Sequence, residues 1–148
     1  MSDIVLKGFD ELQDAFKAIS TIPTSVMKEA VDAMGKAAED KVRETGRSMG
    51  VWDPGNDGDH VLNHVSHSKP KRRQDGHVKA FITFKGVRRR GNTETRNAAI
   101  AFFNEFGVEK RGIPARPFII TALARHEDEI QKPAEKIIGD WIEQTYLK

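Results

Sequence analysis

The chain of 148 residues contains no cysteine, which excludes disulfide bonds, thiolate catalysis and metal sites built on cysteine. It also has no apolar run near the roughly 18 residues that a membrane-spanning helix needs. The first residues, Met1-Ser2-Asp3, lack the basic and then apolar pattern of a signal peptide. We therefore expect a protein that stays in the cytoplasm, makes no membrane contact, and acts through histidines, charged side chains or its surface.

The charge of the chain is distributed unevenly, although the net charge is only +2. Residues 1–68 carry 7 basic and 12 acidic side chains, whereas residues 69–90 carry 9 basic and 1 acidic side chain. The length is typical of one domain with its own core, so we expect a single domain over residues 1–148. Its basic segment indicates contact with an acidic partner, either nucleic acid or an acidic protein surface.

The first half of the chain predicts two helices. Leu12, Phe16 and Ile19 recur at helical spacing, which indicates a short amphipathic helix over residues 10–19. After Pro23, small and apolar residues recur every three or four positions, which predicts a longer core helix ending at Gly46. We expect the side chain of Thr24 or Ser25 to cap the N-terminus of this helix.

A long loop over residues 47–60 and a basic hairpin region over residues 69–91 are expected next. Two candidate strands, 61–68 and 77–85, of which the second alternates, are joined by a connection that ends in Asp75-Gly76, which predicts an antiparallel hairpin with a basic tip. Residues 87–90 are too charged to belong to the core. The expected basic contact surface consists of Lys69, Lys71, Arg72, Arg73, Arg88, Arg89 and Arg90.

The second half predicts a third helix that is capped by residue 92 or 93 and ends at Phe106, with Gly107 following in a positive-φ conformation. The side of this helix that we expect to be buried carries Ala98, Ala99, Phe102, Phe103 and Phe106. A linker rich in proline and glycine follows. Pro117 suits the first turn of a last helix, and Pro133 should kink or split that helix.

Residues suited to catalysis are few. If this segment were a helix, His60, His64 and His67 would lie on one face of it and would be placed to bind zinc together with Asp57 or Asp59. A strand is favoured here, however, and it places His60 and His64 on one face and His67 on the other. The chain has no phosphate-binding loop, nucleophile elbow or paired-carboxylate motif. We therefore expect no enzymatic activity, metal or cofactor, and a histidine-based hydrolase is the weakest alternative.

The most specific pattern is an aromatic helix ending in Glu105-Phe106-Gly107, followed after a short stretch by Pro114-Ala115-Arg116-Pro117-Phe118 and a long amphipathic helix. This pattern resembles the tail-component family of long-tailed phages, whose members complete the tail or join it to the head. Gly8-Phe9-Asp10-Glu11-Leu12 is similar to the start of that family. The resemblance covers most of the chain.

The resemblance implies an α+β fold, with a twisted antiparallel sheet, a long helix packed across it and a C-terminal helix. It also implies a structural virion protein of the neck, present in the host cytoplasm during assembly and arranged as a six-subunit ring. The implied partners are other neck and tail proteins, such as a tail terminator or head-completion protein, with non-specific contact to phage DNA. The alternative is a small nucleic-acid-binding protein that uses residues 69–90.

The residues of this junction also have a physical interpretation. Phe106 and Phe118 flank a stiff linker and should each be largely buried. Arg116, held between two prolines, should bond backbone carbonyls or a carboxylate such as that of Glu105. The expected assembly or structural junction consists of Glu105, Phe106, Gly107, Pro114, Arg116, Pro117 and Phe118.

Overall fold

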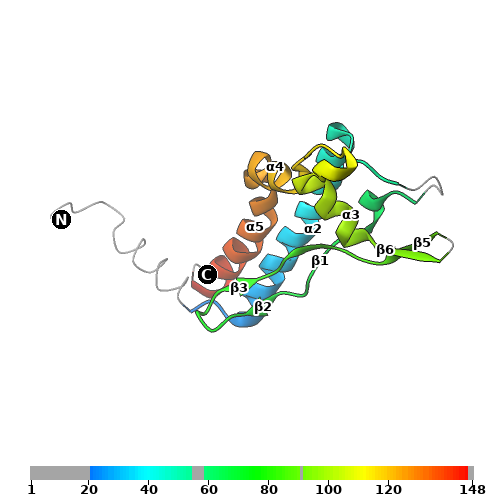
Figure 1. Ribbon diagram of the computed structural model, residues 1–148. Coiled ribbons are helices and arrows are strands. Elements are labelled where there is room, and N and C mark those ends of the chain that lie inside the picture. Colours follow the sequence, from blue (N-terminus) through cyan, green and yellow to red (C-terminus); the bar gives the residue numbers. More distant parts are fainter. Residues whose placement is uncertain (1–20, 55–58, 91, 147–148) are drawn as a thin grey trace.

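The computed structural model describes residues 21–54, 59–90 and 92–146 (Figure 1). The helix expected over residues 10–19 and the centre of the loop expected over residues 47–60 lie outside these ranges. Within them, long helices and short antiparallel strand pairs form an α+β fold, as expected. The strands form three separate two-stranded ladders rather than one twisted sheet.

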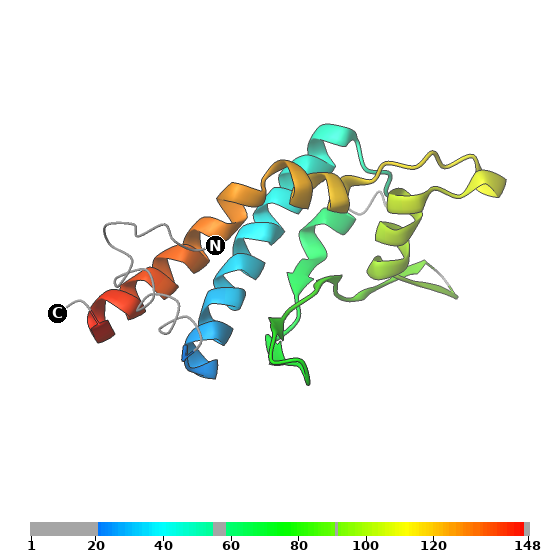
Figure 2. The same cartoon turned by 90° about the vertical axis from the view of Figure 1, so that its left-hand side faces the viewer.

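Helix α2, Thr24–Met49, is the central element, and α5, α4 and the first hairpin all pack on it (Figure 2). The expected side-chain cap is absent, because the helix starts after Pro23 and neither hydroxyl bonds its first turn. The expected end at Gly46 is also wrong. Gly46 is buried, and a Cβ there would lie 2.6 Å from Leu62 Cδ2. Gly46 thus permits close packing, and Gly50, with φ 69°, ends the helix.

The predicted hairpin with its tip at Asp75-Gly76 is confirmed. Strand β1, Val65–His67, pairs with β4, Ile82–Phe84, and β2, Lys71–Arg72, pairs with β3, Val78–Lys79. The register shifts by one residue between the two ladders, from Val65 opposite Phe84 to Lys71 opposite Lys79. The first strand is shorter than predicted because Val61–His64 forms a 3-10 turn, in which the His60 side chain accepts a hydrogen bond from Leu62 N at 3.1 Å.

A second hairpin replaces the predicted first turn of the third helix. Strand β5, Val87–Arg90, pairs with β6, Thr93–Arg96, and helix α3, Asn97–Phe106, begins only after it. Two β-branched threonines in β6 favour an extended chain over a helix. The charged segment after Gly86 is therefore a paired strand.

The C-terminal third contains the short 3-10 turn Glu109–Arg111, helix α4, Phe118–Arg125, and helix α5, Glu127–Tyr146. The last helix is divided at His126, whose φ of −112° leaves the helical region, whereas Pro133 lies inside α5. Three acidic residues open α5, which favours a new N-terminus at this point. Helix α5 runs beside α2, and Lys41 pairs with Glu129 at 2.5 Å between them (Figures 1 and 2).

The core lies where α2 meets the first hairpin, α3 and α4. Phe118 is fully buried, as predicted, and its ring meets that of Phe84 edge to face with centroids 5.9 Å apart. The remaining buried members of this cluster are Val42, Val51, Val61, Leu62, Val65, Ile100, Ala101 and Ala122. None of the helices in the described ranges is long and apolar enough to cross a membrane.

Two helical glycines give a test of the close packing between α2 and the hairpin. In a helix, replacing glycine by alanine usually adds up to about 1 kcal/mol of stability. Gly35→Ala in α2 should instead destabilise the fold, because its Cβ would lie within 2.5 Å of His67 Cγ. Gly139→Ala in α5, where a Cβ meets nothing within 4 Å, should stabilise it. Urea unfolding of both variants checks this, and a stabilised Gly35→Ala variant would contradict the packing.

Candidate assembly surface

Helix α3 has an inner face on which three of the five buried side chains are polar, and an aromatic outer face. The buried residues of α3 are Asn97, Ile100, Ala101, Asn104 and Glu105. The aromatic side that was expected to be buried is largely turned to solvent instead: Phe102 is 58% exposed and Phe106 is 66% exposed. The prediction for Phe106 is therefore wrong.

The reason lies in the hydrogen bonds of Asn104, which is fully buried. Its Nδ2 donates to Trp52 O at 2.8 Å and to Ile100 O at 2.9 Å, and its Oδ1 accepts from Trp52 N at 2.6 Å. These bonds satisfy the backbone of the chain that leaves α2. No apolar side chain at this position can replace them, because buried backbone groups require polar partners.

Glu105 performs the same task for the start of α4. Its two carboxylate oxygens accept from Ile119 N at 2.8 Å and Ile120 N at 3.2 Å. The first amide groups of a helix have no partner within the helix and carry partial positive charge, so a carboxylate stabilises them. Glu105 thus binds the start of α4. The bond that was expected between Glu105 and Arg116 is not formed.

The third polar side chain on the inner face of α3, Asn97, contacts Arg88 of strand β5. The guanidinium of Arg88 bonds both carboxylate oxygens of Asp53, at 2.5 and 2.9 Å, the side-chain oxygen of Asn97 at 3.0 Å and the backbone oxygen of Asp59. Arg88 is only 8% exposed. Its prediction as part of an exposed basic surface is wrong, because Asp53 neutralises it inside the fold.

The segment between α3 and α4 folds back on itself. Gly107 has φ 76°, as predicted, and a Cβ there would lie 2.8 Å from Ala115 N. Val108 and Ile113 bond each other across the loop, and Arg116 N donates to Asn104 O at 2.5 Å. The segments 105–107 and 114–118 are therefore brought together, with Pro114 and Pro117 exposed on the linker.

The guanidinium of Arg116 makes no hydrogen bond or ion pair with the residues that the structure describes, although the side chain is half-buried. Its main chain, rather than its charge, braces the junction. The neighbouring rings of Phe102 and Phe106 contact each other on the outer side of α3, with centroids 4.7 Å apart and planes tilted by 47°. We call Phe102 and Phe106 the aromatic pair.

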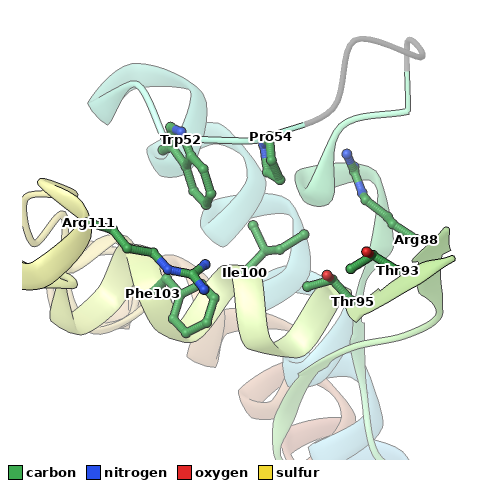
Figure 3. Close-up of a pocket in the computed structure, with 8 residues that line it drawn as sticks. All are labelled: Trp52, Pro54, Arg88, Thr93, Thr95, Ile100, Phe103 and Arg111. Atoms are coloured by element: carbon green, nitrogen blue, oxygen red, sulfur yellow. The ribbon is translucent and has the colours of Figure 1, made fainter. Parts of the chain in front are cut away.

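A cavity of about 260 Å³ opens beside α3 (Figure 3). Its lining carries neither a carboxylate nor a histidine: Trp52, Pro54, Arg88, Thr93, Thr95, Ile100, Phe103 and Arg111. Of its two guanidinium groups, that of Arg88 is bound to Asp53, and that of Arg111 lies 5.8 Å from the Phe103 ring centre. The cavity offers no side chain suited to general acid or base catalysis.

The structure does not unite the expected basic surface. Lys69, Lys71, Arg72 and Arg73 are exposed on the first hairpin, where Arg72 donates to Thr24 at the start of α2. The β5–β6 hairpin lies at a different end of the molecule in both views (Figures 1 and 2). There Arg89 pairs with Glu94 at 3.5 Å, and the side chain of Arg90 lies outside the description.

The three histidines likewise have separate environments. His60 lies 3.7 Å from Asp53, His64 bonds Asp59 at 2.8 Å, and His67 reaches α2. Within residues 21–54, 59–90 and 92–146, no three metal-ligating side chains converge. A shared zinc site of these histidines has no support in this geometry.

His67 is held between two carboxylates of α2. Its Nε2 lies 2.7 Å from Asp32 Oδ1 and its Nδ1 lies 2.6 Å from Glu39 Oε1. A neutral imidazole has a single N–H, so both bonds require the charged imidazolium. Burial lowers the pKa of His67, but hydrogen bonds to Asp32 and Glu39 outweigh it and raise this pKa above 6.5. The bond from His67 in turn lowers the pKa of Asp32, which also pairs with Lys36 at 3.6 Å.

Comparison with known proteins adds no assignment: no family, curated protein or solved structure matches the chain.

The cluster around His67 predicts a pH-dependent stability. Because the pKa of His67 is higher in the folded chain than in the unfolded chain, its stabilisation is complete below pH 6.5 and is lost as the pH rises through the raised pKa. As the pH rises from 6.5 through the raised pKa of His67, the free energy of unfolding of the wild type should therefore fall relative to that of His67→Gln. Urea unfolding at a series of pH values from 6.5 upward measures this difference, and parallel pH profiles for the two proteins would refute the prediction.

Proposed function

We propose that the protein is a non-enzymatic structural component of the neck of a long-tailed phage or prophage, which completes the tail or joins it to the head. The proposal is supported by the resemblance of the Glu105-Phe106-Gly107 and Pro114-Ala115-Arg116-Pro117-Phe118 segments to the tail-component family. It is also supported by the physical division of α3 into an inner face that holds the fold and an outer face that the fold does not use.

The observation that carries the proposal is the exposed aromatic pair. Exposed phenylalanine rings are costly to keep in water, and aromatic side chains are enriched where proteins bind one another. Phe106 belongs to the motif on which the resemblance depends, yet it is 66% exposed. A role in binding a neighbouring subunit explains both facts together.

The junction gives this surface a fixed shape. Glu105 fixes the start of α4, Gly107 permits the tight approach to Ala115, and Arg116 N bonds the carbonyl of Asn104. Ile120, which is 63% exposed, lies on α4 beside Glu105. An apolar surface built on two helices held in this way is preorganised, which lowers the entropy lost on binding.

The partners proposed for this surface are other copies of the chain in a six-subunit ring and neighbouring neck proteins, such as a tail terminator or head-completion protein. Non-specific contact with phage DNA is proposed for the first hairpin. Nucleic-acid binding as the main function has less support, because Arg88 is buried against Asp53 and Arg89 pairs with Glu94.

The double variant Phe102→Ser and Phe106→Ser tests the proposal in the phage or prophage that encodes the chain. Deletion of the gene should yield separate heads and tails by electron microscopy. Complementation with the double variant should leave them separate, although the purified variant unfolds within about 1 kcal/mol of the wild type, as is usual for surface changes.

Val87→Ser is the matched control, because Val87 is 46% exposed on another element. This variant should restore joined particles in normal numbers. If the folded double variant restores joining as fully as the wild type, or if purified particles contain none of the protein, the proposed function is wrong.

A further inference from the structure

The outward face of the first hairpin collects more positive charge than the fold neutralises. Lys71 and Lys79 stand directly opposite each other, and Arg73 follows on the same face. Arg72 and Val78 point to the other side, where Arg72 donates to Thr24 of α2 and Val78 is half-buried. Side chains alternate along a strand, so the face with the two lysines is directed away from α2.

This arrangement carries a cost. Like charges directly opposite each other weaken a strand pair. The one acidic side chain of the tip, Asp75, lies 4.0 Å from Lys79 and 3.1 Å from His77. Arg73 instead stacks on the exposed Phe81, with its guanidinium 5.3 Å from the ring centre. An anionic partner from outside the molecule would offset the repulsion.

The same chain displays a complementary face on α5. That helix has six acidic and two basic residues, and its apolar positions, led by Ile130 and Ala134, are turned to the core. On its exposed side lie Asp128, Glu135 and Glu143, with Lys132 between the first two. These three carboxylates make no ion pair with any residue that the structure describes.

Helix α2 lies between the hairpin and α5 (Figure 2). The two faces therefore point to opposite sides of one molecule and are unable to meet within it. We propose that the outward hairpin face of one copy, with Lys71, Arg73 and Lys79, binds the outward face of α5 in a second copy. This contact rests on the proposed function, in which copies of the chain meet around an axis.

The spacing of two of the three carboxylates agrees with such a contact. Asp128 and Glu135 are seven residues apart on a helix, or about 10 Å. Lys71 and Arg73 are two residues apart on a strand, or about 7 Å, and Lys79 lies about 5 Å across from Lys71. Long basic side chains cover the difference. Because the two faces differ, each copy keeps one face free for the next, and such a head-to-tail contact forms a ring where the rotation between copies closes.

Two charge-reversal variants of the full chain test the contact. One variant carries Lys71→Glu, Arg73→Glu and Lys79→Glu in the hairpin, and the other carries Asp128→Lys, Glu135→Lys and Glu143→Lys in α5. Sedimentation velocity of the purified wild type should show self-association. The self-association of each variant alone should be weaker than that of the wild type by about tenfold or by a larger factor, because charges at an interface of this kind determine the choice of partner.

An equimolar mixture of the two variants should associate again, since the reversed hairpin then meets the reversed α5 and the unchanged faces meet each other. Recovery in the mixture also shows that both variants are folded. A control with the same change in net charge as the hairpin variant, Lys85→Glu, Lys110→Glu and Arg125→Glu, should self-associate like the wild type.

Several outcomes would overturn the contact: a monomeric wild type, a folded α5 variant that associates normally, or a mixture that stays dissociated. Salt-dependent binding of duplex DNA, lost in the hairpin variant while self-association is unchanged, would assign the hairpin face to nucleic acid instead. These results are independent of whether particles contain the protein, so the contact fails separately from the proposed function.

Discussion

The fold depends on the polar inner face of α3. Three side chains of this helix, Asn97, Asn104 and Glu105, bind backbone or charged groups of three irregular connections: the chain after α2, the chain before β5 and the start of α4. Strands of two to four residues leave much of this backbone outside any ladder. Among the described residues, no buried side-chain nitrogen or oxygen is without a partner. Buried polar groups in folded proteins are satisfied in this way.

This constraint determines what the protein shows to its surroundings. A helix of ten residues has room for one inward face, and here the hydrogen-bonding side chains share it with Ile100 and Ala101, which belong to the apolar core. The aromatic pair is consequently directed outward, while the apolar core is made by α2, Phe84, Phe118 and small aliphatic side chains. The residues that hold the fold and the surface available for assembly thus lie on opposite sides of the same helix. A change on one side need not disturb the other.

The long central helix and the hairpin were predictable because they follow simple rules. Apolar spacing marks the helix through Val42, the Asp75-Gly76 pair marks the hairpin turn, and positive φ at Gly107 follows from its place after Phe106. The end of the central helix was not predictable, because Gly46 allows a close contact with Leu62, a residue that is distant in sequence.

The orientation of α3 was harder to predict because two spacings compete. Phe102 and Phe106 recur four residues apart, but Asn97, Asn104 and Glu105 recur seven and eight apart and define the other side. Hydrophobicity alone selects the first pattern. The burial of Arg88 depends on Asp53, which is 35 residues away in the chain, and a local charge run gives no sign of such a partner. The burial of Phe118 was therefore predicted correctly, whereas Phe106 was expected to be buried and is exposed, and Arg88 was expected to be exposed and is buried.

A comparison of the unfolding free energies of Asn104→Ala and Phe106→Ala tests this division of α3 most directly. Loss of Asn104 leaves the amide and carbonyl of Trp52 unpaired, so we expect a loss of about 1–3 kcal/mol or more. Loss of Phe106 removes a mainly exposed ring and should cost less than about 1 kcal/mol. The opposite order, with Asn104→Ala nearly neutral and Phe106→Ala costing the roughly 3–5 kcal/mol of a buried phenylalanine, would contradict the account.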